Sequence, residues 1–553
     1  MYQCKEIASM DWLSKSDPIA ELFVKSAKDD DYVFIGTTEM QKNTYSPKFS
    51  VKIECAYCFE ARQFCKFVLY DVDNAGSNSM KKEEIGYFEC KMSKIMTAPN
   101  CYLVDAPLQA APALSGKKVG TISVLAEAVK GRRGETLKLK MSGKNMLNKD
   151  GLFGKSDPYL KIRAIRGDGS VEDVPGNTTK WIDNEENPIW EELCVSMFEL
   201  CRGDVSVKVR LEAWDKDDIG SDDQIGLVDV TLAEIFAGKE LEMIDYKTPP
   251  RDLKPGSLQM VSGSIERVPT FFDYLEGGTE FSASVAIDFT ASNLQVLDPV
   301  SLHYLDDDKD NQYQTAIQAV ISIIEDYDTD KRFACWGFGA VLTHLERKEA
   351  DHCFPLTFDE SNTEVHGVAG VMEAYRNAVS QVKLYGPTNF APVIQAATER
   401  ALKHKKDIYH VLLIITDGEI SDMQETKDAI VKGADAPLSI IVIGVGKEDF
   451  SNMKELDSDT GALVASDGKQ AVRDIVQFVP FSKSGGDPVE LAKSVLAELP
   501  MQVVSHMCAA KQIPPAFAKA TVPFSAPEGD WFGKFYNRCK VHKLYSCVQC
   551  FGF

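Results

Sequence analysis

Acidic side chains recur at matched spacing in the first half of this chain, and their clustering suits calcium binding. Asp150 and Asp157 flank one loop, and Asp215, Asp217 and Asp223 form the pattern D-x-D-x5-D further along. Carboxylates repel one another, so gathering several at one edge costs stability unless a cation lies among them. Ca²⁺ takes roughly six to eight hard oxygen ligands in flexible geometry. These acids are therefore candidate Ca²⁺ ligands, and the alternative is a solvated acidic turn.

These acids belong to an internal repeat with an offset of about 140 residues. Ser14-Lys15-Ser16-Asp17-Pro18 recurs as Gly154-Lys155-Ser156-Asp157-Pro158, and Pro47-Lys48-Phe49 recurs as Pro188-Ile189-Trp190. Between these landmarks, apolar and polar residues alternate and are interrupted by Gly, Asn, Asp and Pro. The pattern predicts two all-β sandwiches, each with its acids on loops at one end.

Each unit resembles the C2 domain, whose calcium ligands are two Asp in one loop and three acids in another. In the first unit the resemblance implies the ligands Asp11, Asp17, Asp71, Asp73 and Glu84. Glu84 is the fifth because the short-loop spacing would place the last acid at Ser79, whereas a longer loop would present Glu84. Only ten residues precede Asp11. Either a segment is missing before this unit or its first strand is shortened, and we expect weaker Ca²⁺ binding here.

The overall charge bears on possible partners. Lys and Arg number 61 against 83 Asp and Glu, which gives a net charge of −22. Such a chain is a poor partner for nucleic acid and is repelled by anionic membranes. Bound Ca²⁺ would reverse the local charge and share the oxygens of phosphatidylserine. Apolar side chains beside the acids would then enter the membrane interface, or simply pack within their loops; they are Trp12, Leu13, Leu152 and Phe153.

The hydrophobic pattern changes in the second half of the chain. The segments 281–289, 411–416 and 438–445 are nearly continuous apolar runs, typical of strands buried on both faces of a parallel sheet. Helical patterns separate these runs, so we expect a doubly wound α/β domain. Domains of this class bind ligands at the carboxyl ends of their strands.

Polar residues gather at that expected edge. The first strand leads into Asp288-Phe289-Thr290-Ala291-Ser292, Thr388 precedes a predicted helix, and a later strand leads into Asp417. Together they resemble the metal-ion-dependent adhesion site of von Willebrand factor A domains. The resemblance implies that Thr290, Ser292 and Thr388 ligate Mg²⁺ or Mn²⁺ directly, while Asp288 and Asp417 hold the ion directly or through water. One position would stay open for a partner's carboxylate. The alternative is that these residues only cap strands and helices.

The order of two C2-like units and one A-like domain resembles the copine family. The phrases Phe272-Asp273-Tyr274-Leu275-Glu276-Gly277-Gly278 and Tyr385-Gly386-Pro387-Thr388-Asn389-Phe390 also look like copine sequence. The resemblance implies a protein that moves to membranes when Ca²⁺ rises, binds acidic phospholipids through its C2 pair and recruits target proteins through its A domain. The expected segments are two C2 domains (1–130 and 131–268), an A domain (269–485), a C-terminal helix (486–510) and a variable tail (511–553).

Other functions find less support in the residues. We find no phosphate loop, nucleophile elbow or zinc-protease motif, so an enzyme is not expected. There is no apolar run of membrane-spanning length and no signal-peptide pattern, which favours a cytoplasmic protein recruited to the plasma membrane or other membranes. A Ca²⁺-independent protein scaffold remains the alternative. The tail holds Cys539, His542, Cys547 and Cys550, which suit zinc, lipidation or a partly disordered segment with reduced thiols.

Overall fold

The computed structural model describes residues 2–8, 15–75, 79–128, 135–149, 154–217, 221–244, 254–267, 269–404, 408–448, 450–457, 463–512, 514 and 549–552. These residues form two compact units. Unit 1 combines residues up to 127 with those from 271 to 514 and with 549–552, and unit 2 holds the described residues between 128 and 270. Unit 1 thus contains the first sandwich and the α/β domain, and unit 2 is the second sandwich.

The first sandwich has two antiparallel sheets, with strand orders β4-β1-β10-β8 and β3-β2-β6-β7-β9. The strands of the first sheet are β1 (Tyr2–Lys5), β4 (Lys48–Phe49), β8 (Tyr102–Pro107) and β10 (Thr121–Leu125). Those of the second are β2 (Pro18–Ser26), β3 (Val33–Thr37), β6 (Gln63–Ala75), β7 (Ser79–Lys91) and β9 (Gln109–Ala110). Connecting segments are β5 (Glu54–Tyr57), α1 (Met92–Met96), η1 (Pro99–Cys101), η2 (Pro112–Leu114) and β11 (Glu127–Ala128). Although β1 is short, it pairs with both β10 and β4 and so supplies the first strand of the sandwich.

The second sandwich repeats this plan, with strand orders β15-β12-β19-β18 and β14-β13-β16-β17. Its strands are β12 (Glu135–Lys144), β13 (Pro158–Ile165), β14 (Val171–Glu172), β15 (Leu193–Ser196), β16 (Lys208–Asp215), β17 (Asp223–Thr231), β18 (Leu241–Glu242) and β19 (Ser257–Arg267). Two short helices, α2 (Met197–Cys201) and α3 (Leu232–Phe236), follow β15 and β17 at the end of the sandwich opposite Asp215. Alternate residues of β12 point inward, and Trp190 fills the core between the sheets, where its indole N–H donates to the carbonyl of Pro158 at 2.9 Å.

The α/β domain is built on a mixed sheet with the order β23-β21-β20-β26-β27-β28. Strands β20 (Glu280–Asp288), β21 (Arg332–Phe338), β26 (Ile408–Thr416), β27 (Leu438–Gly444) and β28 (Val476–Pro480) run parallel. Strands β23 (Phe354–Pro355) and β24 (Glu364–His366) pair antiparallel with β21, and β22 (Ala340–Val341) pairs with β25 (Lys383–Leu384). The segments 281–289, 411–416 and 438–445 therefore correspond to β20, β26 and β27, which confirms the predicted α/β class.

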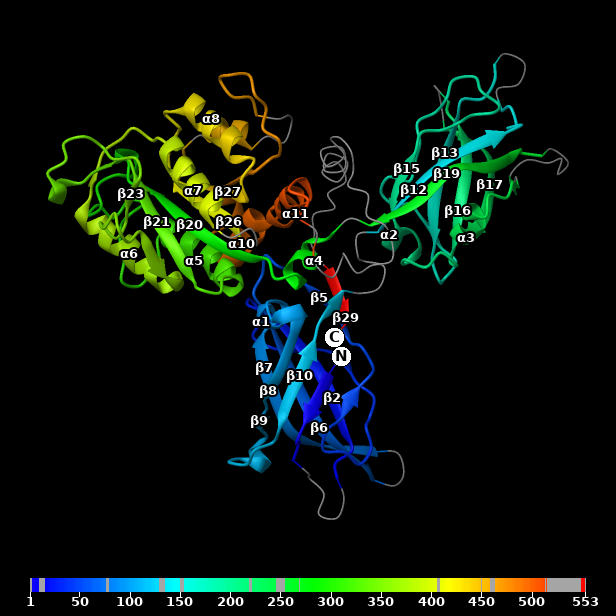
Figure 1. Cartoon of the computed structure of the whole chain (residues 1–553), viewed down its shortest axis with the longest axis horizontal. Helices are drawn as coiled ribbons and strands as arrows, with labels where there is room; N and C mark the ends of the chain where they lie inside the picture. Colours follow the sequence, from blue (N-terminus) through cyan, green and yellow to red (C-terminus); the bar gives the residue numbers. More distant parts are fainter. Residues whose placement is uncertain are drawn as a thin grey trace. The chain divides into compact units, whose positions relative to one another are not determined.

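Helices cover both faces of this sheet. The helices are α4 (Phe271–Glu276), α5 (Gln312–Ile324), α6 (Gly367–Gln381), α7 (Ala391–Lys403), α8 (Met423–Gly433), α9 (Ser451–Leu456), α10 (Pro488–Leu496) and α11 (Leu499–Ala509), with short turns η3 (Ala291–Asn293), η4 (Glu325–Tyr327), η5 (Thr343–Leu345) and η6 (Phe481–Ser484). In Figure 1, α5 and α6 lie on one side of β20 and β21, and α7 and α8 lie on the other. None of the described helices is long and apolar enough to span a membrane.

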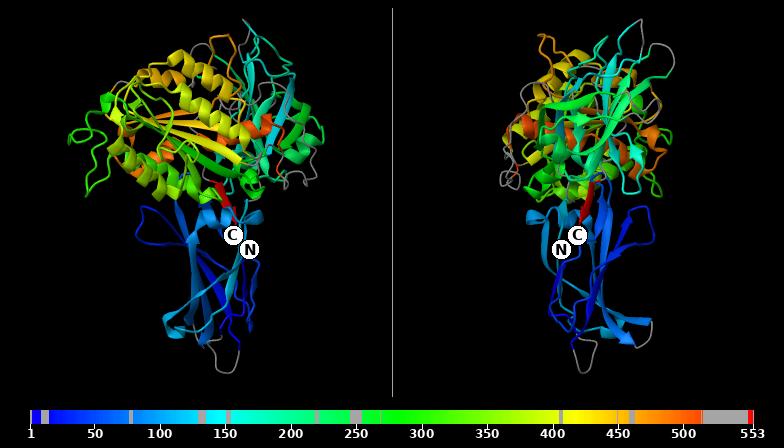
Figure 2. Two further views of the ribbon diagram at one scale, coloured as in Figure 1. Left: turned by 60° about the vertical axis from the view of Figure 1, so that its left-hand side comes forward. Right: turned by 90° about the vertical axis from the view of Figure 1, so that its right-hand side faces the viewer.

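Two terminal features differ from the sequence-based expectation. The single helix expected over 486–510 is two helices, because the chain breaks at Ala497 and Glu498 and restarts with Pro500 in the first turn of α11, where its missing N–H needs no partner. The tail also contains regular structure. Its last described residues form β29 (Gln549–Gly552), which pairs antiparallel with β5 and appears in red in both views of Figure 2. The region 515–548, with Cys539, His542 and Cys547, lies outside the described residues.

Candidate metal centres at strand ends

One buried aspartate lies at the acidic end of each sandwich, held by the same hydrogen bonds in both copies. In the second sandwich the backbone N–H of Asp157 donates to Oδ1 of Asp215 at 2.6 Å. In the first, the N–H of Asp17 donates to Oδ1 of Asp71 at 2.7 Å. Asp215 is fully buried and Asp71 is 3% exposed. Each pair forms because a proline-initiated strand, β2 or β13, starts opposite the aspartate in register.

An asparagine that sequence reasoning missed completes each arrangement. The N–H of Asn43 donates to Oδ1 of Asp17, and that of Asn184 donates to Oδ1 of Asp157, both at 2.6 Å. Both asparagines adopt a left-handed backbone with φ of 52°, a conformation that asparagine tolerates better than most residues. The two asparagines are 141 positions apart, which matches the offset of the repeat, so aligning the two copies could have identified them.

The second sandwich adds further acids beside Asp215. Asp223 lies directly opposite Asp215 in the β16–β17 ladder, so the two side chains share one face of the sheet. The pKa of the half-buried Asp217 is raised by desolvation and by the negative charges of Asp215, Asp223 and Asp222. Asp222, which the sequence pattern did not select, accepts hydrogen bonds from the hydroxyl of Tyr159 at 2.7 Å and from Lys216 at 2.8 Å. The described acidic side chains at this end of the second sandwich therefore lie close together.

Glu84 does not join the acids of the first sandwich. The β6–β7 hairpin continues to the pair Ala75 and Ser79, so Glu84 lies within paired strand rather than in the connecting loop. It stands opposite Tyr70, while Asp71 stands opposite Glu83. Because successive side chains alternate between the faces of a strand, Glu84 points to the face away from Asp71. The loop spacing chosen from sequence was wrong because strand pairing extends further than the acidic pattern indicates.

Several predicted residues lie outside what the structure describes. Asp11 and Asp150 are among them, as are the four apolar residues expected at the membrane, Trp12, Leu13, Leu152 and Phe153. The backbone of Asp73 is described within β6, opposite Lys81, but its side chain is not. These positions stay predictions.

The residues predicted to bind a cation in the α/β domain do come together at the carboxyl ends of β20 and β26. Asp288 is fully buried, and its Oδ1 accepts the backbone N–H of Thr290 at 2.8 Å and its hydroxyl at 2.6 Å. Ser292 Oγ lies 2.9 Å from the hydroxyl of Thr290 and donates to Oδ1 of Asp417 at 2.9 Å. Thr388 joins from a separate loop: its Oγ1 and the Oγ of Ser292 are each 3.6 Å from the point where a Cβ on Gly418 would lie.

Backbone contacts explain how these distant segments meet. Parallel pairing of β20 with β26 sets Asp288 beside Thr416, whose hydroxyl donates to Oδ2 of Asp288 at 2.5 Å. A parallel bridge joins Thr290 to Tyr385, and the N–H of Ala291 donates to the carbonyl of Tyr385 at 2.8 Å. These contacts hold the loop that leads to Thr388 beside Thr290 and Ser292.

Two buried residues that were not predicted brace this site. Asn293 donates from its amide to Oδ1 of Asp417 at 2.9 Å and accepts the hydroxyl of Tyr313 at 2.8 Å. His303 is fully buried and bonds through Nε2 to the carbonyl of Asp288 at 2.8 Å. Asn293 immediately follows the recognised turn, so its position in the sequence could have suggested it. His303, in contrast, reaches the site only through the path of the chain after β20.

Electrostatics at this site favour a bound cation. Burial raises the pKa of Asp288, and burial together with the charge of Asp288 raises the pKa of Asp417 to about 7. Two carboxylates held this close in a desolvated pocket repel each other when both are ionised. Carboxylates and hydroxyls are also the oxygen ligands that Mg²⁺ prefers. The donor set therefore fits a small divalent cation. In the first sandwich, Oδ2 of Asp71 is buried without a hydrogen bond from the described residues, which likewise fits a cation.

Comparison with known families agrees with this architecture. Residues 1–102 and 136–245 match the family model of the C2 domain, and residues 301–515 match that of Copine. The chain belongs to the copine family. Its domain content is that of a membrane-binding adaptor related to Ca²⁺: C2 domains generally bind Ca²⁺ and commonly bind acidic phospholipids, and the domains of both families are generally non-enzymatic.

Solved structures similar to this copine-family chain include further C2 domains. The structure titled "BON1-C2B" has 23% identity and a TM-score of 0.22, covering 24% of this chain and 94% of that one. A single C2 domain of plant extended synaptotagmin 1 has 20% identity and a TM-score of 0.19, covering 24% and 92%. The calcium-bound pair of C2 domains from extended synaptotagmin 2 has 12% identity and a TM-score of 0.19, covering 48% and 94%.

Proposed function

We propose that this protein is a calcium-dependent phospholipid-binding adaptor. In this proposal both sandwiches bind Ca²⁺ at their acidic ends and attach to membranes rich in phosphatidylserine. The α/β domain then recruits a target protein through a divalent cation, Mg²⁺ or Mn²⁺. The protein is cytoplasmic at low Ca²⁺, moves to the plasma membrane or other membranes when Ca²⁺ rises, and has no catalytic activity.

The single observation that carries this proposal is the duplicated aspartate arrangement. Each copy orients a buried carboxylate by a backbone amide in an otherwise acidic setting. Burying a carboxylate is costly unless hydrogen bonds or a cation offset its charge, and a backbone amide orients the buried carboxylate at the same place in both copies. In the second sandwich, the residues proposed to hold Ca²⁺ are Asp150, Asp157, Asp215, Asp217 and Asp223; in the first they are Asp11, Asp17, Asp71 and Asp73.

The proposal for the α/β domain rests on the cluster around Asp288 and Asp417. Thr290, Ser292 and Thr388 supply hydroxyl oxygens, and the exposed position of Ser292 leaves the cluster open to solvent on one side. A cation held there gains a further ligand when a partner presents a carboxylate. This chemistry selects acidic sites on target proteins.

Sedimentation with phosphatidylserine liposomes across a Ca²⁺ titration tests the membrane function. We expect the native chain to sediment with liposomes only when Ca²⁺ is present, and Asp215→Asn/Asp217→Asn to need far more Ca²⁺. Asp229→Asn is the matched control, since Asp229 belongs to the same sandwich but pairs with Arg210 through two hydrogen bonds away from the acidic end.

Two other results of the sedimentation experiment would change this proposal. Unchanged binding by Asp215→Asn/Asp217→Asn would move the calcium sensor to the first sandwich. Equal binding with and without Ca²⁺ would favour the Ca²⁺-independent scaffold and reject the proposal.

A further inference from the structure

An aromatic side chain of the first sandwich packs against three aromatic rings of the α/β domain. Phe59 lies in the turn between β5 and β6 and is 1% exposed. Its ring centroid is 4.9 Å from that of Phe271, 5.4 Å from that of Phe281 and 4.7 Å from that of Tyr327. All three partners belong to the α/β domain. Centroid separations of this size are those of favourable aromatic pairs.

Polar contacts surround this aromatic cluster. The hydroxyls of Tyr57 and Tyr327 form a buried hydrogen bond. Arg62 donates to the carbonyl of Ser322 at 2.9 Å. An apolar centre enclosed by paired polar groups is the usual anatomy of a specific protein interface.

One ion pair at the same interface is well shielded from solvent. Lys91 Nζ lies 2.6 Å from Oδ1 of Asp326, whose side chain is only 10% exposed. Ser93 adds a hydrogen bond of 3.3 Å to Oδ2 of the same carboxylate. Removing Lys91 would leave Asp326 charged and nearly buried without its partner, which is far more costly than losing a surface pair.

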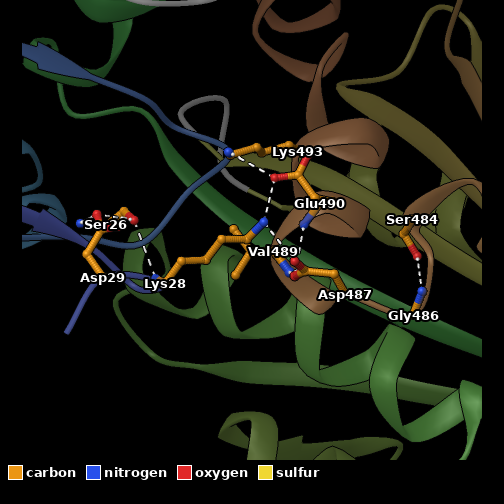
Figure 3. Close-up of polar contacts among 9 residues, drawn as sticks. All are labelled: Ser26, Lys28, Asp29, Ser484, Gly486, Asp487, Val489, Glu490 and Lys493. Atoms are coloured by element: carbon orange, nitrogen blue, oxygen red, sulfur yellow. Dashed lines mark hydrogen bonds and ion pairs between the residues drawn. The ribbon is translucent and has the colours of Figure 1, made fainter.

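A second, more exposed contact lies at α10. Lys28 Nζ is 2.7 Å from Oδ2 of Asp487 and 2.7 Å from Oε1 of Glu490, as Figure 3 shows. Asp487 also caps α10 by accepting the backbone N–H of Val489 at 2.8 Å. Because these side chains are about one-third to one-half exposed, this contact orients the two parts more than it stabilises them.

Strand register shows that both proposed metal centres point away from this interface. In the β2–β6 ladder, Asp71 pairs with Pro18 at one end, and Gln63 pairs with Ser26 at the other, next to the contact residues. Eight residues of strand separate these ends, or roughly 26 Å. In the α/β domain, Phe281 is near the start of β20 and Asp288 ends it.

We propose that the surface formed by Phe271, Phe281, Tyr327 and Asp326 is a permanent binding site for the first sandwich of the same chain. It makes the first sandwich and the α/β domain one rigid body, with Asp71 and Asp288 at its opposite ends. In the second sandwich the corresponding β15–β16 connection contains helix α2, where Phe198 is half-buried and the guanidinium of Arg202 lies 4.5 Å from its ring centroid. This inference goes beyond the proposed function and does not require it.

Calorimetry and amide hydrogen exchange on the full chain, with no lipid and with divalent cations removed by chelation, test the inference. We expect the first sandwich and the α/β domain to unfold in one transition and the second sandwich in another. Phe59→Ala should split the shared transition into two. Because the substitution should cost about 3 kcal/mol or more, it should also accelerate exchange roughly a hundredfold in both 57–63 and the start of β20. Phe198→Ala, the matched control, should leave that transition whole.

A charge swap covers the case in which Phe59→Ala does not fold. Lys91→Asp and Asp326→Lys should each accelerate exchange on both sides of the interface, and the double variant should restore protection. Three separate transitions in the native chain would overturn the inference. So would a double variant no better than the two single ones, or a Phe59→Ala effect confined to the first sandwich.

Discussion

The backbone amide of Asp157 donates a 2.6 Å hydrogen bond to Oδ1 of Asp215, which fixes a fully buried carboxylate at the acidic end of the second sandwich. The equivalent bond between Asp17 and Asp71 is 2.7 Å long. Each acidic end thus holds its buried aspartate in one orientation before any cation arrives.

Asp217→Asn should stabilise the second sandwich when Ca²⁺ is absent. Desolvation and the neighbouring carboxylates of Asp215, Asp223 and Asp222 raise the pKa of Asp217, and the variant removes the charge that they disfavour. Solvent screens this half-exposed group, so the gain is only a few tenths of a kcal/mol and Tm rises by about a degree. With Ca²⁺ present the variant should be less stable than the native chain, since it loses a ligand. Calorimetry in chelator and in Ca²⁺ measures both effects. Asp229→Asn should show no such reversal, and a reversal there would remove the argument.

Ser292→Ala should abolish stabilisation of the α/β domain by Mg²⁺ without unfolding it. Ser292 is exposed, and the variant loses only the hydrogen bonds to Thr290 and Asp417. At a Mg²⁺ concentration about 100 times Kd, the native domain should gain about 2.7 kcal/mol, or several degrees in Tm. Ser361→Ala, which also removes an exposed serine bonded to an aspartate, should keep this gain. Equal Mg²⁺ responses in the two variants would exclude Ser292 as a ligand.

Gly339→Ala should displace Thr290, one of the proposed ligands in the α/β domain. Gly339 has φ of +79°, and a Cβ there would lie 2.4 Å from Cγ2 of Thr290. Left-handed strain and overpacking together should cost about 3 kcal/mol. Gly468 has a similar φ of +83° but open space around its Cβ position, so Gly468→Ala should cost only about 1 kcal/mol. Denaturant unfolding checks the difference, and similar losses at both positions would contradict the proposed clash.

Asp328→Asn should stabilise the α/β domain increasingly as pH rises. Burial raises the pKa of Asp328 to about 7, so between about pH 4 and 7 the folded carboxyl retains a proton that the unfolded one releases. Native stability at this site therefore falls as pH rises through that window, by up to about 2–3 kcal/mol. Asparagine keeps an oxygen for the N–H groups of Asp330 and Lys331. Stability curves at pH 5 and 7.5 should diverge, and parallel curves would show that Asp328 is already ionised at low pH.

Sequence patterns predicted the fold well where one element buries a regular set of residues. The apolar run at 281–289 became β20, and the repeat around Asp17 and Asp157 became two copies of one acidic strand end. The turn from Asp288 to Ser292 also placed its hydroxyls as expected, because parallel strands bring their carboxyl ends to one edge.

Other residues could not be assigned from sequence, because tertiary contacts decide their roles. Glu84 was misplaced since nothing in the acidic spacing shows how far the β6–β7 pairing extends. The sequence pattern does not distinguish Phe59 from the other aromatic residues of the first sandwich, and its role is visible only from its partners in the α/β domain. His303 reaches the carbonyl of Asp288 from 15 residues away along an irregular segment.

The division of the chain into units carries a consequence for its topology. Unit 1 is discontinuous in sequence, since its first part ends at Glu127 and its second begins at Phe271, with the second sandwich inserted between them. The tandem repeat is thus not a string of independent modules: one copy is a component of a split domain, and the other is an insertion into it. Excising the insertion and bridging 127 to 271 with a flexible linker is the deletion this topology tolerates best. Truncation from either terminus removes part of unit 1 first.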